Sequence, residues 1–187
     1  MIKSFIVAAA MMIGLQAHAN LTQVESTVLV NVLTKPALFD DLFTVGDSAD
    51  YNLSGGILNG TVHMFVRELA AQGWWVEQDI KLAMLGDQKA EALYDKDSGK
   101  VIKLIVNGKE QAPPDQSKMK VIQSHKDKIT VPKGEFDCMY LKIHDDAQNN
   151  DTEVWINAKI PVARMLKQLS QSQIGPVTLE LTDFVKK

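Results

Sequence analysis

The residues that could carry out chemistry are few and lie far apart in the chain. Cys138 is the only cysteine, and His144 follows it six residues later in a stretch expected to be a β-strand. At strand rise this separation is about 20 Å, so the thiol and the imidazole cannot form a nucleophile–base pair. Ser48 lies in G-D-S-A-D, which lacks the second glycine of a nucleophile elbow. The sequence therefore predicts a protein that is not an enzyme and has no cofactor.

Metal-binding patterns are also missing from the sequence. The histidines show neither H-x-x-x-H nor H-E-x-x-H spacing, so no metal site is predicted. The polar run from Asp145 to Asp151 could attract calcium, but it lacks the spaced ligands and closing glutamate of an EF-hand loop. We expect it to be a solvated loop between two strands.

Arg67 and Trp75 form the candidate partner-binding surface. They lie in two expected strands, 61–69 and 74–84, which are joined by a turn. Pairing Val66 with Val76 keeps apolar residues together on one face and places Arg67 opposite Trp75 on the polar face. On that face Trp75 either marks a binding surface or stacks on Arg67, an exposed cation–π contact of about 0.5–1 kcal/mol. In the same register Val62 pairs with Ile80, and His63 lies opposite Asp79.

Alternating apolar and polar residues predict that most of the chain is made of β-strands. Strands are expected at 45–53, 61–69, 74–84, 88–94, 101–106, 119–123, 129–131, 136–143, 153–157 and 177–184. The segment 160–169 fits either a strand or a short helix. One helix is expected at Thr22–Leu33, because apolar residues recur there at helical spacing and Thr22-x-x-Glu25 matches a capping box.

The chain is organised around the segment Lys128–Leu166. A two-residue turn at Lys133-Gly134 would pair Val131 with Phe136 and Ile129 with Cys138. Both faces of the strand after this turn are then apolar, so it is covered on both sides or has one face lining a pocket. The residues on the first face are Phe136, Cys138 and Tyr140, and those on the second are Met139, Leu141 and Ile143.

The N-terminus has the layout of a secretory signal peptide. Residues 1–19 contain one basic residue, an apolar run and an A-x-A end, which leaves 20–187 as a single β-rich domain. The net charge of −3 argues against a nucleic-acid partner. The remaining chain has no apolar run long enough for a transmembrane segment. We expect a periplasmic protein, or a secreted one if the organism lacks an outer membrane.

Several pieces together resemble a group of uncharacterised bacterial envelope proteins with a lipoprotein-carrier-like (LolA/LolB-like) half-barrel. They are Thr44–Asp47 followed by Tyr51, the G-x-W strand Gly73–Trp75, the hairpin Ile129–Cys138, and Trp155 followed by Ile160–Lys167. This chain has Lys133 where the group usually has alanine, and Arg164 where it usually has glycine. The resemblance implies a strongly curved antiparallel sheet with a helix against its concave side.

The fold that we predict is mainly β (α+β), a half-barrel with the helix Thr22–Leu33 on its concave face. The predicted function is that of a non-enzymatic periplasmic binding or carrier domain for a lipid or lipoprotein. The alternative is a structural or interaction module that docks an envelope protein. A filled core accounts for the same apolar residues as well as a pocket does. The predicted ligand-binding residues are Met64, Val66, Val76, Ile80, Phe136, Cys138 and Tyr140, and the predicted partner-binding residues are Arg67 and Trp75.

Overall fold

The computed structural model is mainly β. It describes residues 9–14, 25–31, 43–55, 58–83, 86–113, 118–146, 148–172 and 175–187, and its regular elements in these ranges are strands. The strands are β1 (Ala9–Gly14), β2 (Glu25–Asn31), β3 (Ser48–Gly55), β4 (Leu58–Leu69), β5 (Gly73–Leu82), β6 (Gly86–Asp95), β7 (Val101–Val106), β8 (Lys109–Gln111), β9 (Met119–Val131), β10 (Gly134–Asp145), β11 (Asn150–Ile156), β12 (Met165–Ser172) and β13 (Gly175–Val185). Among these residues no helix is both long and apolar enough to cross a membrane.

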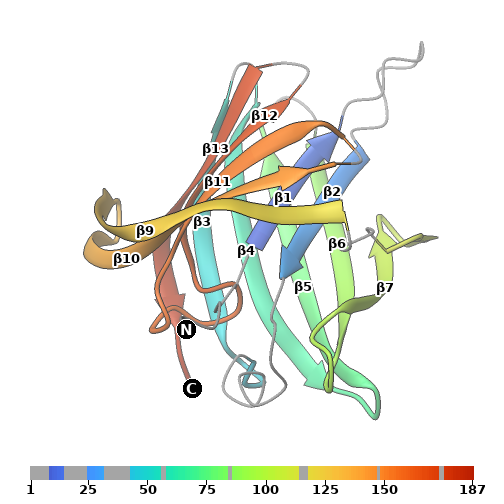
Figure 1. Cartoon of the computed structure of the whole chain (residues 1–187). Helices are drawn as coiled ribbons and strands as arrows, with labels where there is room; N and C mark the ends of the chain where they lie inside the picture. Colours follow the sequence, from blue (N-terminus) through green and yellow to red (C-terminus); the bar gives the residue numbers. More distant parts are fainter. Residues whose placement is uncertain are drawn as a thin grey trace.

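Eleven of the strands form one antiparallel sheet that curves strongly but does not close (Figure 1). The strand order is β8-β7-β6-β5-β4-β3-β13-β12-β11-β10-β9, so most neighbours in the sheet are also neighbours in the chain. The last strand, β13, returns to pair with β3 and joins the two halves. Strands β8 and β9 are the two edges of this sheet. The predicted curved antiparallel sheet is confirmed.

The concave face of the sheet is the apolar one. In β3, Ala49, Tyr51 and Leu53 are buried, while the residues between them are partly or fully exposed. This alternation is expected of a strand with one face toward a core. It continues through the cross-strand partners of these residues, so the core extends across the concave face from β3 to β7.

Strands β1 and β2 pair with each other and lie inside the curve of the sheet (Figure 1). β1 lies beside β11 and β12, and β2 lies beside β6 and β7. The helix expected at Thr22–Leu33 is therefore not confirmed, since Glu25–Asn31 is strand β2, and the rest of that range lies outside the described residues. The β-branched residues Thr27, Val28 and Val30 favour the extended backbone over a helix.

β1 lies within residues 1–19, the range that has the layout of a signal peptide. Cleavage after Ala19 stays a prediction. If it occurs, the mature chain lacks β1, and the place beside β11 and β12 is vacated.

The predicted register of the β4–β5 hairpin is confirmed over most of its length. Val62 pairs with Ile80, Val66 with Val76, and His63 with Asp79. The register shifts after Val66, so Trp75 lies opposite Glu68 rather than opposite Arg67 as predicted. A β-bulge at Arg67 inserts one extra residue into β4 and accounts for this difference.

The predicted register of the β9–β10 hairpin is wrong by two residues. Val131 pairs with Gly134 and Ile129 with Phe136, so the two turn residues are Pro132 and Lys133. Proline has the fixed φ that the first central position of a tight turn requires. Because side chains alternate with a period of two, this shift keeps Phe136 and Cys138 on the same face of the hairpin as Ile129 and Val131, as predicted.

The ambiguous segment 160–169 consists of a turn followed by a strand. The turn is closed by a hydrogen bond of 2.8 Å from the Asn157 amide to the Arg164 carbonyl. Val162 and Arg164 have positive φ angles of 64° and 55°. Such angles favour glycine, which is the residue that the resembled group usually has at the position of Arg164. β12 then pairs with β11 and β13.

Candidate functional site

Four of the predicted ligand-binding residues lie together on the concave face. Met64 and Val66 on β4, and Val76 and Ile80 on β5, are at most 2% exposed. Val62, which pairs with Ile80, also pairs with Tyr51 on β3. The hairpin thus contributes a continuous apolar surface to the concave face.

The other three residues, Phe136, Cys138 and Tyr140, lie on the opposite face of the sheet. Paired residues share a face, and the pairs run from Tyr140 to Trp155, then to Lys167, to Glu180 and to the exposed Asn52. Alternation along β10 gives Phe136 and Cys138 the same face as Tyr140. The seven predicted residues therefore do not line one common hollow.

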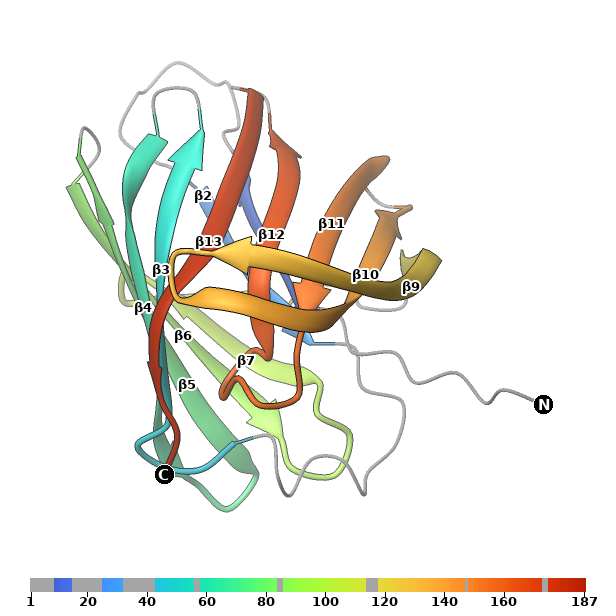
Figure 2. The same cartoon turned by 90° about the vertical axis from the view of Figure 1, so that its left-hand side faces the viewer.

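The tip of the β9–β10 hairpin packs on this same side of the sheet. Its tip crosses over β12 and β13 on the side of the sheet away from β1 and β2 (Figure 2). The Lys133 amide donates a hydrogen bond of 3.1 Å to the Leu181 carbonyl of β13. The Lys133 ammonium group also pairs with Asp183 and lies 5.5 Å from the centre of the Phe184 ring. These contacts hold the tip against the convex face.

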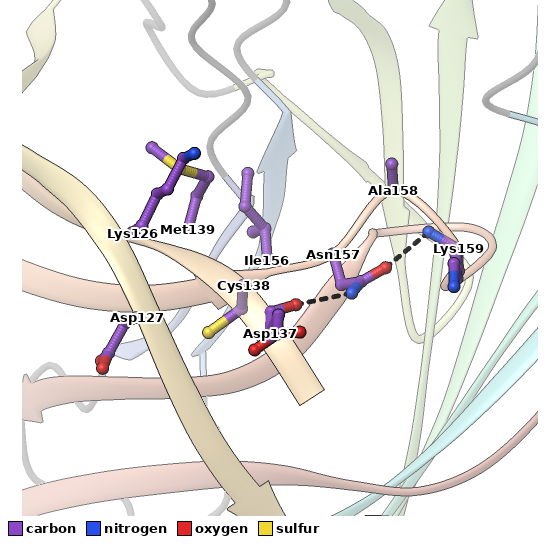
Figure 3. A pocket seen from close by; sticks show the side chains of 9 residues that line it. All are labelled: Lys126, Asp127, Asp137, Cys138, Met139, Ile156, Asn157, Ala158 and Lys159. Atoms are coloured by element: carbon purple, nitrogen blue, oxygen red, sulfur yellow. Dashed lines mark hydrogen bonds between the residues drawn. The ribbon is translucent and has the colours of Figure 1, made fainter. Parts of the chain in front are cut away.

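A groove opens where β10 separates from β11, beyond the pair Met139–Ile156 (Figure 3). Its volume is about 580 Å³, within the range of small-ligand sites. Hydrogen bonds from the Asn157 side-chain amide to the Asp137 carbonyl (2.7 Å) and from the Lys159 amide to Asn157 Oδ1 (2.8 Å) fix one end. The lining residues are Lys126, Asp127, Asp137, Cys138, Met139, Ile156, Asn157, Ala158 and Lys159.

Only Cys138 of the predicted ligand-binding residues lines this groove. Sequence reasoning missed the groove, because it arises from the divergence of two strands and no local motif marks it. Burial, with the charges of Asp127 and Asp137 added, raises the pKa of the Cys138 thiol to about 11. The thiol is therefore protonated near neutral pH and is a poor nucleophile.

Tyr140 contacts other aromatic side chains on the convex face. Its ring centre is 4.6 Å from that of His125 and 5.2 Å from that of Trp155. The Trp155 indole N–H donates a hydrogen bond of 2.8 Å to Asp127, and Lys167 lies 5.9 Å from the Trp155 ring centre. The large side chains of this face thus pack against one another.

Arg67 and Trp75 lie in a cluster of charged residues on the convex face. The Arg67 guanidinium is 5.3 Å from the Trp75 ring centre, which confirms the predicted stacking contact. It also pairs with Glu77, with Glu68 at 3.0 Å and with Glu91 at 3.3 Å. The guanidinium therefore has several intramolecular contacts, and docking of a partner at this pair stays a prediction.

Glu77 is the buried centre of this cluster, with 4% of its side chain exposed. Lys89 approaches its carboxylate to 2.5 Å from the side opposite Arg67. Burial alone raises the pKa of Glu77, but hydrogen bonds from Lys89 and Arg67 outweigh that effect and lower it. The cluster is thus a stabilising ion network within one sheet.

Two of the histidines, His63 and His144, are held by carboxylates. His63 Nδ1 lies 2.7 Å from Asp50, and His144 Nδ1 lies 2.7 Å from Asp151. In the part of the chain that the structure describes, no group of His, Cys, Asp and Glu side chains has the arrangement of a metal site.

No protein-family model matches the sequence, and no curated protein matches it either. Among solved structures, the chain is similar to the hypothetical protein CT021 from Chlamydia trachomatis, with 12% identity, a TM-score of 0.49, and coverage of 81% of this chain and 92% of that one. It is also similar to MucB, with 11% identity, a TM-score of 0.43, and coverage of 79% and 55%. A third similar structure is the MucA/MucB complex of Pseudomonas aeruginosa, with 12% identity, a TM-score of 0.41, and coverage of 80% of this chain and 56% of that one. The chain spans about half the length of the MucB chains.

Proposed function

We propose that this protein is a non-enzymatic carrier of the bacterial periplasm that holds an apolar, lipid-like ligand against the concave face of its sheet. The observation that supports this proposal is the continuous apolar face of β3 to β7 on a sheet that stays open. Met64, Val66, Val76 and Ile80 are the ligand-contacting residues of this face. Methionine suits such a surface, because its unbranched side chain adapts to a variable occupant.

The competing explanation is a filled core, in which β1 and β2 complete the packing of the concave face. In the carrier, β1 leaves with the signal peptide, and the concave face that this opens takes up a ligand. The two explanations differ in what the mature concave face tolerates. In a hollow, a larger side chain fits and reduces ligand binding. In a packed core, it lowers the free energy of unfolding.

Ala92→Phe on β6 tests this difference, because Ala92 is 2% exposed and pairs with Val76 on the concave face. In a hollow, the added ring leaves the free energy of unfolding within about 1 kcal/mol of the wild-type value and lowers the binding of N-phenyl-1-naphthylamine. In a packed core, it costs about 1–3 kcal/mol or more. Ala71→Phe in the exposed β4–β5 turn is the control, and we expect it to change neither quantity. Destabilisation by Ala92→Phe without dye binding to the wild type would contradict the carrier.

The alternative function, an interaction module of the cell envelope, is favoured by one observation. β9 is a long edge strand with Ile122 56% exposed, and an exposed edge can receive a strand from a partner. If β9 docks a partner, Ile122→Lys should abolish a cross-link to an envelope protein. Ile102→Lys, at a residue 41% exposed on β7, should leave the cross-link intact. Equal effects of both substitutions would count against docking at β9.

A further inference from the structure

Gln78 is an unusual residue on the apolar concave face. It lies on β5 between Val76 and Ile80, and its cross-strand partners are Met64 and Ala90. The residue is 1% exposed, and neither its side-chain carbonyl nor its side-chain amide has a hydrogen-bond partner among the described residues. A buried polar group without a partner is costly, and an apolar side chain at this position would avoid that cost.

Gln88 on β6 is a second amide close to Gln78 on the same face. It pairs with Ile80, two residues from the Ala90 that pairs with Gln78, so the two amides are diagonal neighbours. Side chains in this relation are within about 7–8 Å of each other. The Gln88 side-chain carbonyl is also buried and lacks a partner among the described residues. Three unpartnered polar atoms therefore lie together within an apolar surface.

The surroundings of the two amides restrict what could bind them. The cross-strand and adjacent concave-face residues are Met64, Val76, Ile80, Ala90 and Ala92, none of which carries a charge. An ionised ligand group would find no counter-ion among these described sheet residues, and burying a charge unpaired is far more costly than burying a neutral polar group. An amide side chain offers both N–H donors and a carbonyl acceptor, so it can bind an ester, an amide or a hydroxyl group.

We propose that Gln78, assisted by Gln88, anchors the uncharged polar linkage of an acyl-chain ligand, such as the ester and hydroxyl groups of an acylglycerol. This inference rests on the carrier function proposed above and narrows its ligand class. Neutral acyl esters are preferred over bare hydrocarbons and over fatty-acid carboxylates. The apolar residues around the anchor hold the chain, and the two amides fix its polar end in the middle of the sheet.

The test uses the full chain, expressed with residues 1–19 and purified from the periplasm of a Gram-negative host. Displacement of bound N-phenyl-1-naphthylamine is measured with monooleoylglycerol, oleate and 1-octadecene. Gln78→Leu removes the amide at similar size. The substitution should weaken the binding of monooleoylglycerol about tenfold, the effect of roughly one lost hydrogen bond. It should leave the affinity for 1-octadecene unchanged. Gln72→Leu, in the exposed β4–β5 turn, is the matched control and should alter neither.

Thermal melting of the ligand-free protein supplies the second readout. Gln78→Leu should raise the Tm, because it removes an unpartnered buried amide; a lower Tm would show that the amide has a structural partner and would overturn the anchor. The anchor would also be overturned if wild type and Gln78→Leu bound monooleoylglycerol with equal affinity, or if Gln78→Leu lost as much affinity for 1-octadecene as for monooleoylglycerol. Either result would leave the carrier function standing. Failure of the wild type to bind any probe would overturn the carrier function, and the anchor with it.

Discussion

At the residue scale, the ion network around Glu77 is the most closely connected polar feature of the described structure. One carboxylate with 4% side-chain exposure receives Arg67 on one side and Lys89 on the other. Hydrogen bonds to charged groups are worth more than neutral ones, and removing one partner leaves the others unpaired. We therefore expect this position to respond strongly to substitution although it lies outside the concave face.

Glu77→Gln should lower the free energy of unfolding at pH 7 by about 1–3 kcal/mol, as measured by urea denaturation. Arg67 and Lys89 lose their charged acceptor while the amide keeps the size of the side chain. The control is Glu110→Gln, whose carboxylate is 66% exposed and lies 3.2 Å from Lys103. We expect this exposed pair to contribute less than about 1 kcal/mol. Equal effects at the two positions would contradict the role given to Glu77.

The same network predicts a pH dependence. The pKa of Glu77 is lower in the folded chain than its ordinary value of 4.5. The ionised form is therefore favoured by folding. Its contribution to the free energy of unfolding is complete above pH 4.5 and is lost as the pH falls through the folded-state pKa. Wild type should lose stability more steeply below pH 4.5 than Glu77→Gln does. Parallel acid limbs of the two denaturation profiles would contradict the lowered pKa.

At the element scale, the two hairpins show what a hydrophobic pattern can and cannot determine. A one-residue slip of β4 against β5 would place Met64 opposite Asp79 and Val66 opposite Glu77, both charged, so only one register fits, and it is the register that the pattern predicts. In β9–β10 both faces are apolar, and a slip of two residues preserves every face. The pattern cannot distinguish these registers, and the turn at Pro132-Lys133 decides between them.

Strand β2 shows a different reason for failure. Val24, Val28 and Val32 recur at helical spacing, but Thr27, Val28 and Val30 are β-branched, and the segment pairs with β1. Pairing with a distant segment is tertiary information that a local period does not contain. The bulge at Arg67 was missed for the same reason, because it appears only when β4 and β5 are aligned residue by residue.

Gly60 tests the close approach of β4 and β5. A Cβ atom at this position would lie 1.9 Å from the Lys81 carbonyl oxygen, which is backbone and cannot move without disturbing the hairpin. Gly60→Ala should therefore lower the free energy of unfolding by about 1–3 kcal/mol or more. Gly86→Asn in the next hairpin is the control, since a Cβ there meets no atom within 4 Å and asparagine tolerates the φ of +77°. We expect Gly86→Asn to lower the free energy of unfolding by less than about 1 kcal/mol when both variants are measured in the same way.

At the scale of the whole molecule, the curved open sheet was predictable, while the placement of its candidate sites was not. Alternation and turn residues gave the antiparallel strands, and the motifs resembling lipoprotein carriers gave the curvature. Cross-strand pairing, however, places Phe136, Cys138 and Tyr140 on the face opposite Met64, and the hairpin tip folds over β12 and β13 on that side. The groove of about 580 Å³ beside Cys138 follows from this path, as does the exposed edge of β9.

The central claim is that the concave face of the exported protein holds an apolar ligand. Native mass spectrometry of the full chain, expressed with residues 1–19 and purified from the periplasm without detergent, tests it directly. We expect a species heavier than the mature polypeptide by the mass of a lipid, which organic extraction removes and returns as a neutral acyl compound. A single species with the mass of the polypeptide alone, together with an empty extract, would contradict the claim.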